Sequence, residues 1–369
     1  GAGLLRSCAL LRLLRCFRAL SPDTTASFAE AADAATVAAY ERVLTAKLTT
    51  ASQQNQAALP TRLGGCGMLR FRNLRAQAWL GSWLGTLPAV RALAGPGLTT
   101  RDVITGSTTT WAAALRRAVE ELAAEGEHLA HAGEVSSAPP ATAWGWEDEA
   151  PALARRQRLL SRRRAEAARG RLLQSLPDAA RARLRSCGGA GAAAWILATP
   201  TGEATRFTDL EYKVCSRLRL RIPLHLEGAG KRCKNQRGGN LAGGAELVAP
   251  GGECSKPLDA DGFHALVCQV GGLVIRRHHS LRDAFAWIGR QAGYAVRTEV
   301  YEPAWTRART NAEGELEFDQ GRLDNGFEGP PSDPLIYGDV VVTHPEGSAC
   351  LHAAAKEDGT AAPKAADGK

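Results

Sequence analysis

The chain has 369 residues, a length that suggests two or three domains. Hydrophobic residues make up 44% of it, and its formal net charge of +8 favours a polyanionic partner. Nine cysteines, an odd number without regular spacing, argue against a secreted disulfide scaffold and indicate an intracellular, reducing compartment. The sequence contains no run of eighteen apolar residues, so we expect no membrane-spanning segment.

Residues 1–100 are predicted to be helical. The first twenty residues contain arginines and no acid, which suits an organellar transit peptide or a buried amphipathic helix, and we favour the helix. Ser27 and Glu30 have the spacing of a capping box. The helix that they would start carries an apolar face formed by Val37, Tyr40, Leu44 and Leu48. After a glycine-rich break, a second helix is expected to end before Pro88.

Residues 101–217 are predicted to form a basic, mostly helical connector. Between Pro151 and Arg185 there are eleven arginines and only two acidic residues. Two interpretations remain open: a salt-sensitive binding site for nucleic-acid phosphates, or a solvated helix face with linker character. The candidate phosphate contacts, two of them further along the chain, are Arg155, Arg156, Arg162, Arg163, Arg164, Arg276 and Arg277.

A glycine-rich segment, which cannot build a core unaided, follows from about residue 218. Cys233, Cys254, His264 and Cys268 lie in or after it, separated by twenty, nine and three residues. The last two can be placed on one turn, and zinc prefers mixed thiolate and imidazole ligands. A structural zinc ion would also replace missing hydrophobic burial. Because no tight C-x2-C pair is present, the spacing alone leaves zinc and unligated core thiols as alternatives.

Residues 280–369 are predicted to form a small α+β domain. Ser280 and Asp283 can cap a helix that stops at Gly293. Three strands follow in YAVRTEVY (294–301), LEFDQGRLD and LIYGDVVVT, because apolar residues alternate there. The apolar face of the helix is predicted to consist of Leu281, Phe285, Ile288 and Ala292.

Acidic residues stand at the ends of these predicted strands, namely Glu299, Glu302, Asp324 and Asp339. Carboxylates at neighbouring strand ends can converge on Mg²⁺, which activates water for phosphodiester cleavage. A lysine two residues after the second acid would orient that water, but Val341 stands there, and Lys356 is the candidate replacement. The alternative is that these acids are simply solvated.

The order of these motifs resembles a known family. LLRSCALLRLLRCFRALSP and LPTRLGGCGMLRFRNLRAQAWLGSW are similar to the segment after the polymerase palm in non-LTR retrotransposon reverse transcriptases. The cysteine and histidine order, followed by RLD and DVVVT, resembles the zinc-binding and restriction-endonuclease-like segments of such proteins. The resemblance covers most of residues 1–100 and 215–345, and it includes no polymerase active site.

This resemblance implies the C-terminal region of a retroelement protein, acting on chromosomal DNA in the nucleus with DNA and RNA as partners. It implies a thumb-like region at 1–100, the connector at 101–217, a zinc segment at 218–279 and an endonuclease-like domain at 280–369. Structural Zn²⁺ would be held by Cys233, Cys254, His264 and Cys268. Catalytic Mg²⁺ would be held by Asp324 and Asp339, with Glu299 or Glu302 as a third ligand. A non-catalytic nucleic-acid-binding module remains the alternative.

Overall fold

The computed structural model describes residues 10–94, 109–110, 112–118, 120–121, 156–203, 206–224, 230–235, 254–310, 314–319, 321–330, 334–347 and 350–358. The chain divides into two compact units. The first consists of Gly1–Leu224 and Ser348–Thr360, and the second of His225–Gly347 and Ala361–Lys369. The boundary at Leu224 lies close to the predicted change of character near residue 218.

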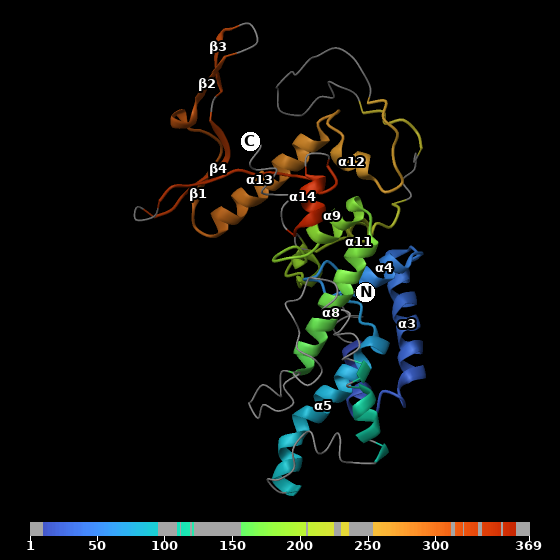
Figure 1. Cartoon of the computed structure of the whole chain (residues 1–369). Helices are drawn as coiled ribbons and strands as arrows, with labels where there is room; N and C mark the ends of the chain where they lie inside the picture. The colour runs from blue at the N-terminus through green and yellow to red at the C-terminus, as the bar shows by residue number, and fades with distance from the viewer. Residues whose placement is uncertain are drawn as a thin grey trace. The chain divides into compact units, whose positions relative to one another are not determined.

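The first unit is built from helices (Figure 1). This confirms the prediction that the N-terminal two-thirds of the chain is mainly α-helical. None of the described helices in either unit is both long and apolar enough to cross a bilayer. The helices are α2 (Leu10–Ala19), α3 (Ala26–Leu44), α4 (Ala51–Ala58), α5 (Phe71–Ala94), α8 (Arg156–Ser175), α9 (Asp178–Ser186), α10 (Ala194–Leu197), α11 (Asp209–Leu220) and α14 (Leu351–Lys356).

The N-terminal helix α2 is buried on one face, as predicted, with Leu10 and Phe17 almost fully covered. The predicted capping box at Ser27 was wrong. Helix α3 begins at Ala26, and its N-cap residue Thr25 makes no side-chain cap hydrogen bond. The Thr25 hydroxyl instead donates to the carbonyl of Ser21, at 3.0 Å. The preceding residues form a hydrogen-bonded turn, in which the carbonyl of Asp23 accepts from the amide of Ala26, the first residue of α3.

The predicted helix end before Pro88 was also wrong, because α5 continues to Ala94. A proline inside a helix lacks the amide hydrogen for one backbone hydrogen bond, and α5 continues beyond Pro88 without that bond. Full capping boxes do occur elsewhere in this unit. Thr50 and Gln53 cap α4, and Thr208 and Glu211 cap α11.

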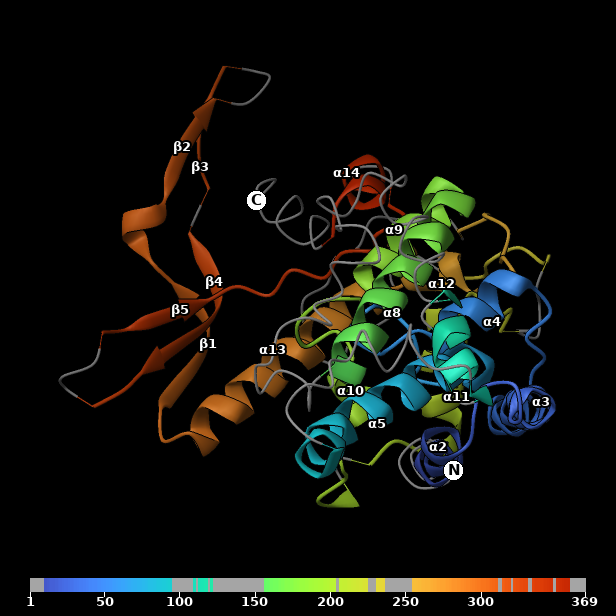
Figure 2. The same cartoon turned by 60° about the horizontal axis from the view of Figure 1, so that its bottom comes forward.

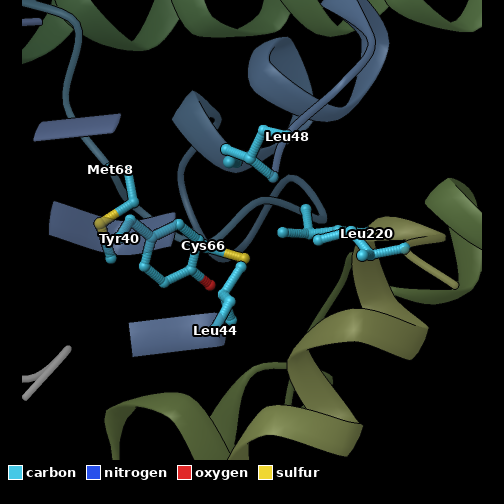
Figure 3. Close-up of a cluster of buried hydrophobic side chains, with 8 residues drawn as sticks. Tyr40, Leu44, Leu48, Cys66, Met68 and Leu220 are labelled. Atoms are coloured by element: carbon cyan, nitrogen blue, oxygen red, sulfur yellow. The ribbon is translucent and has the colours of Figure 1, made fainter. Parts of the chain in front are cut away.

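One hydrophobic core of the first unit joins α3, the loop after α4 and the end of α11 (Figure 3). Its buried members include Tyr40, Leu44, Leu48, Cys66, Met68 and Leu220. The predicted apolar face of α3 therefore forms a core, with Val37 partly buried against it. Burial of each large side chain of this kind contributes about 1.5–3 kcal/mol.

Close backbone contacts make Gly65 a sensitive position in the loop after α4. A Cβ atom there would lie 2.0 Å from the carbonyl oxygen of Leu59 and 2.6 Å from that of Gln56. We expect Gly65→Ala to lower the free energy of unfolding by about 3 kcal/mol, because backbone atoms cannot yield as a flexible side chain can. Urea denaturation would measure the loss.

Gly85→Ala in α5 is the matched control. An added Cβ at this exposed helical position meets nothing within 4 Å. Alanine favours a helix over glycine, so stability should rise by about 0.5–1 kcal/mol. Similar losses in the two variants would contradict the proposed backbone clash at Gly65.

The last described residues of the chain belong to the first unit, where α14 packs against α9. The carboxylate of Asp358 accepts hydrogen bonds from Arg169 Nη2 at 2.6 and 2.7 Å and from Arg185 Nη1 at 2.9 Å. Burial raises the pKa of Asp358, but the two guanidinium groups outweigh that effect and hold the pKa below its ordinary value. These hydrogen bonds hold the segment just after α14 against α8 and α9.

Asp358→Asn is expected to lower the free energy of unfolding at pH 7 by about 1 kcal/mol, since the ion pairs are partly exposed. A carboxyl group whose pKa is depressed by folding stabilises the fold above its ordinary pKa of about 3.9. That contribution is lost as the pH falls through the lower, folded-state pKa. Denaturant titrations at pH 7 and about pH 3 should show the wild type and the variant converging in acid. If the difference in unfolding free energy between the wild type and Asp358→Asn did not change with pH, the Asp358 carboxylate would not stabilise the fold through its charge.

The second unit contains helices and a small sheet, which confirms a small α+β C-terminal region. Strands β1, β4 and β5 form an antiparallel sheet in the order β1-β4-β5, and β2 pairs with β3 as a separate hairpin (Figure 2). Helix α13 packs against β1 and β4. The elements are α12 (Phe263–Val267), α13 (Leu273–Gln291), β1 (Ala295–Tyr301), η5 (Pro303–Trp305), β2 (Arg307–Thr310), β3 (Leu316–Asp319), β4 (Arg322–Glu328) and β5 (Ile336–Gly338).

The start of α13 differs from the prediction. The helix begins at Leu273, so Ser280 lies inside it and its hydroxyl donates to the carbonyl of Arg276 at 2.9 Å. Gly272, with φ of 69°, turns the chain into the helix, and a left-handed conformation of this kind favours glycine. The predicted stop at Gly293 is confirmed, because α13 ends at Gln291. The third predicted strand is shorter than expected, since β5 ends at Gly338.

Candidate metal centre and carboxylate site

Two segments on either side of the glycine-rich stretch pair with each other. The backbone amide of Cys233 donates to the carbonyl of Lys256, and the amide of Cys254 donates to the carbonyl of Asn235, both at 2.8 Å. An isolated antiparallel bridge between Arg232 and Pro257 extends the pairing. This short ladder places two cysteines side by side although they are far apart in the sequence.

The turn that follows brings His264 to the same place. One carboxylate oxygen of Asp259 accepts the amide of Phe263 at 2.7 Å, and the other accepts the amide of His264 at 2.6 Å. Burial raises the pKa of Asp259, but these amides outweigh it and lower the pKa below its ordinary value. Asp259 therefore stabilises the start of α12 and the turn that returns His264 towards Cys254.

The four side chains converge as predicted. The sulfur atoms of Cys233, Cys254 and Cys268 and a ring nitrogen of His264 all lie within 4.8 Å of one another. Cys254 Sγ is 3.5 Å from His264 Nε2. A sulfur and a nitrogen at two corners of a zinc tetrahedron would be about 3.6 Å apart, given zinc–ligand lengths of about 2.3 and 2.0 Å. All four residues are less than 10% exposed. The group can hold a metal ion.

The surroundings of the cluster favour a thiolate at Cys268. Burial raises the pKa of this thiol, but a hydrogen bond from Asn235 Nδ2, at 3.5 Å, helps to lower it below its ordinary value. Metal-bound cysteine must be deprotonated, so this hydrogen bond assists ligation. Asn235 was not predicted, because nothing in its spacing distinguishes it from a surface asparagine.

A second group of polar side chains lies on the sheet of the same unit. Strands β4 and β5 are antiparallel, with Asn325 opposite Gly338. Asp339 directly follows β5, one residue beyond this pair, and a side-chain hydrogen bond with Asp339 is among the interactions that lower the pKa of Asp324. The backbone amide of Val340 donates to Asp324 Oδ2 at 2.6 Å. The structure thus brings together the two aspartates that the sequence predicted as partners.

His278 of α13 completes this group. Its Nε2 lies 2.8 Å from Asp324 Oδ1. Burial raises the pKa of Asp324, but Asp339, the Val340 amide and His278 together hold it below its ordinary value. His278 is not among the site residues predicted from the sequence. It lies inside α13, which starts seven residues earlier than the predicted capping residue Ser280, and nothing in the sequence distinguishes it from its neighbour His279.

The other predicted catalytic residues are placed differently. Glu299 pairs with the guanidinium groups of Arg282 and Arg322 and has φ of 58°. Glu302 accepts a hydrogen bond from the hydroxyl of Tyr337 at 2.8 Å. Lys356 is exposed on α14 in the first unit, whereas the aspartates belong to the second. Within the part of the chain that the structure describes, one group of three or more Cys, His, Asp or Glu side chains lies close enough together to share a metal ion. That group is the cysteine and histidine cluster.

The predicted phosphate-binding arginines divide into exposed and engaged side chains. Arg162, Arg163 and Arg276 are exposed, and Arg162 also contacts Glu166 at 2.9 Å. Arg164 lies 3.6 Å from Glu121, and Arg277 donates to the carbonyl of Leu266 at 2.8 Å. Arg156 begins α8, and the prediction for Arg155 lies outside the described residues.

Comparisons with known proteins give no further assignment. No protein-family model, no curated protein and no solved structure was found to match this chain. Arguments about function therefore rest on the resemblance in motif order and on the two groups of side chains in the second unit.

Proposed function

We propose that the second unit is a zinc-stabilised, metal-dependent DNA-nicking module of a non-LTR retrotransposon reverse-transcriptase protein. The observation that carries this proposal is the hydrogen bond between the side chain of Asp324 in β4 and that of Asp339, which directly follows the neighbouring strand β5. Acidic residues at strand ends are common, but two carboxyl groups held this close need a reason. Cation binding gives one, because the repulsion between two carboxylates is relieved by a metal ion between them.

The residues present suit Mg²⁺, which is bound through one or two carboxylates together with substrate phosphates. Asp324 and Asp339 would hold the ion. When bound, Mg²⁺ would activate a water molecule and stabilise charge on the scissile phosphate. The amide of Val340 and the ring of His278 fix the orientation of the Asp324 carboxylate. Each Asp324 oxygen keeps a further lone pair, and a bound ion would take the place of the hydrogen bond with Asp339.

The cysteine and histidine cluster supplies stability to this module. Three buried thiols and one imidazole are the donors that zinc prefers in a closed, structural site. The long glycine-rich stretch between Cys233 and Cys254 offers few apolar side chains for a core. We assign Zn²⁺ to this site on that chemistry, with a structural role.

Nucleic acid is the partner that the charge distribution favours. The exposed side chains of Arg162, Arg163 and Arg276, together with the net charge of +8, suit contacts with phosphates of DNA or RNA. Such a protein would act on chromosomal DNA in the nucleus, as its resemblance to retroelement proteins implies.

A non-catalytic zinc-containing nucleic-acid-binding module is the second candidate. The observation in its favour is that Glu299, which could complete a three-carboxylate site, is neutralised by Arg282 and Arg322. Such a module would bind DNA with the same salt dependence as the nicking module, but it would not cleave the DNA.

A plasmid-nicking assay with the whole chain separates the two candidates. We expect Mg²⁺-dependent nicking that Asp324→Asn reduces by about two orders of magnitude, with DNA binding retained. Asp283→Asn, which changes an exposed carboxylate on α13, is the control and should nick at the wild-type rate. Salt-sensitive binding without any nicking would favour the non-catalytic module. Nicking that survives Asp324→Asn would reject the site.

A further inference from the structure

A cavity of about 420 Å³ lies between α4, α5 and α8 of the first unit, where α8 runs alongside α5 (Figures 1 and 2). Its volume falls in the range of about 300–1,000 Å³ that is usual for small-molecule sites. Aliphatic side chains, among them Leu59, Leu74 and Leu172, form much of its wall. The cavity can therefore take a ring-sized apolar group.

One polar side chain in the wall is incompletely satisfied. Gln77 is fully buried and lines the cavity. Its Oε1 accepts a hydrogen bond from the hydroxyl of Ser161 at 3.0 Å, while its Nε2 has no partner among the described residues. Rotating the amide by 180° exchanges the two atoms and still leaves one of them unpaired. Because a buried amide without a partner costs free energy, this position favours a ligand that supplies one.

The residues that line the cavity also carry positive charge. Arg70, Arg164 and Arg171 line it, and no aspartate or glutamate of the described segments does. Arg70 donates to Asn55 Oδ1 at 2.9 Å and Arg164 faces Glu121, whereas Arg171 is exposed. An anionic group on the ligand would meet this set of guanidinium groups at the edge of an apolar space.

We propose that this cavity binds a nucleotide, with the base beside Gln77 and the phosphate near Arg70 and Arg171. A fatty acid would satisfy the arginines but leave the Gln77 amide unpaired, and a small anion would leave the apolar space unfilled. A nucleobase presents hydrogen-bond donors and acceptors on a flat apolar ring. The nucleotide can be a free mononucleotide or a single residue turned out of a nucleic-acid strand. This proposal does not depend on the zinc cluster or on the aspartates.

Isothermal titration of the whole chain with UMP and with ribose 5-phosphate tests the recognition of the base. We expect UMP to bind at least about tenfold more tightly, since ribose 5-phosphate cannot reach Gln77. Arg171→Glu and Ala165→Phe, which fills the cavity, should each weaken UMP binding about tenfold or more. Arg12→Glu makes the same charge change at an exposed position of α2 that does not line the cavity, and it should change the affinity by less than about twofold.

A short single-stranded oligouridylate, with and without one abasic position, distinguishes the two sources. If UMP does not bind but the intact oligonucleotide binds more tightly than the abasic one, and Ala165→Phe removes that difference, the ligand is a nucleotide within a strand. The proposal would be overturned if UMP and ribose 5-phosphate bound with equal affinity and Ala165→Phe did not change the affinity for the oligonucleotide. Gln77→Leu adds a direct test of the amide. If that variant is unfolded by circular dichroism, the half-buried Ala165 decides the result.

Discussion

Cys254→Ser is expected to abolish zinc binding and to unfold the segment of the second unit around residues 230–268. Three sulfur atoms and one imidazole converge there with little other core, since among the described residues only Leu258 and Val270 are partly buried hydrophobic side chains packed against the three thiols. Structural zinc in comparable sites contributes about 10–16 kcal/mol of apparent binding free energy at pH 7. Loss of one ligand should therefore cost this segment most of its stability, whereas unligated core thiols would tolerate the serine far better.

Metal analysis and hydrogen exchange measure this effect. Purified wild-type protein should contain about one zinc ion per chain, and a strong chelator should raise exchange rates at the amides of Cys233, Cys254 and His264. Cys16→Ser is the control, because Cys16 is an exposed free thiol on α2, and it should keep its zinc. Unchanged exchange and melting in the presence of chelator would mean that the four side chains are packed without a metal.

Arg219→Ala is expected to have the largest effect on the first unit, lowering its free energy of unfolding by about 3–5 kcal/mol. The guanidinium group is 5% exposed and donates to four backbone carbonyls. These carbonyls belong to Gly65 (3.1 Å), Ala192 (3.3 Å), Thr61 (3.0 Å) and Cys187 (2.7 Å). Removing it leaves several buried acceptors unpaired, and it disconnects α11 from two loops at once.

Thermal unfolding followed by circular dichroism would show the loss as a fall in melting temperature of about 10 °C. Arg219→Lys should recover only part of it, since an ammonium group cannot span four separated acceptors. Lys213→Ala, at a half-exposed position of the same helix, should change the stability by less than about 0.5 kcal/mol. A similar small change for Arg219→Ala would show that water replaces the guanidinium group in the folded protein.

The cysteine and histidine cluster was predictable from the sequence, whereas its immediate partners were not. The identity and order of Cys233, Cys254, His264 and Cys268 carry chemical information, because few residue types bind zinc. Asn235 and His278 act through contacts with Cys268 and Asp324, which lie 33 and 46 residues away along the chain. Neither residue type is specific for such a role, so only the folded backbone reveals the pairs.

The helix α13 shows a second limit of sequence patterns. Periodicity correctly predicted that Leu281, Phe285 and Ile288 share one face, but these side chains are 40–55% exposed. A pattern tells which residues lie together on a helix and not whether another element covers them. The start of the same helix was missed because Gly272 takes a left-handed conformation, whereas Ser280 offered the more familiar capping residue.

The division of the chain has a consequence for synthesis on the ribosome. The larger piece of the second unit, His225–Gly347, separates the two pieces of the first along the chain. Helix α14 and Asp358 therefore join α8 and α9 only after more than a hundred intervening residues have been made. At about 5–20 residues per second, α9 would wait on the order of ten seconds for α14. During that interval the α9 surface that α14 later covers would be open to chaperones. Nascent chains arrested before residue 351 should therefore be more sensitive to protease in the first unit than completed chains.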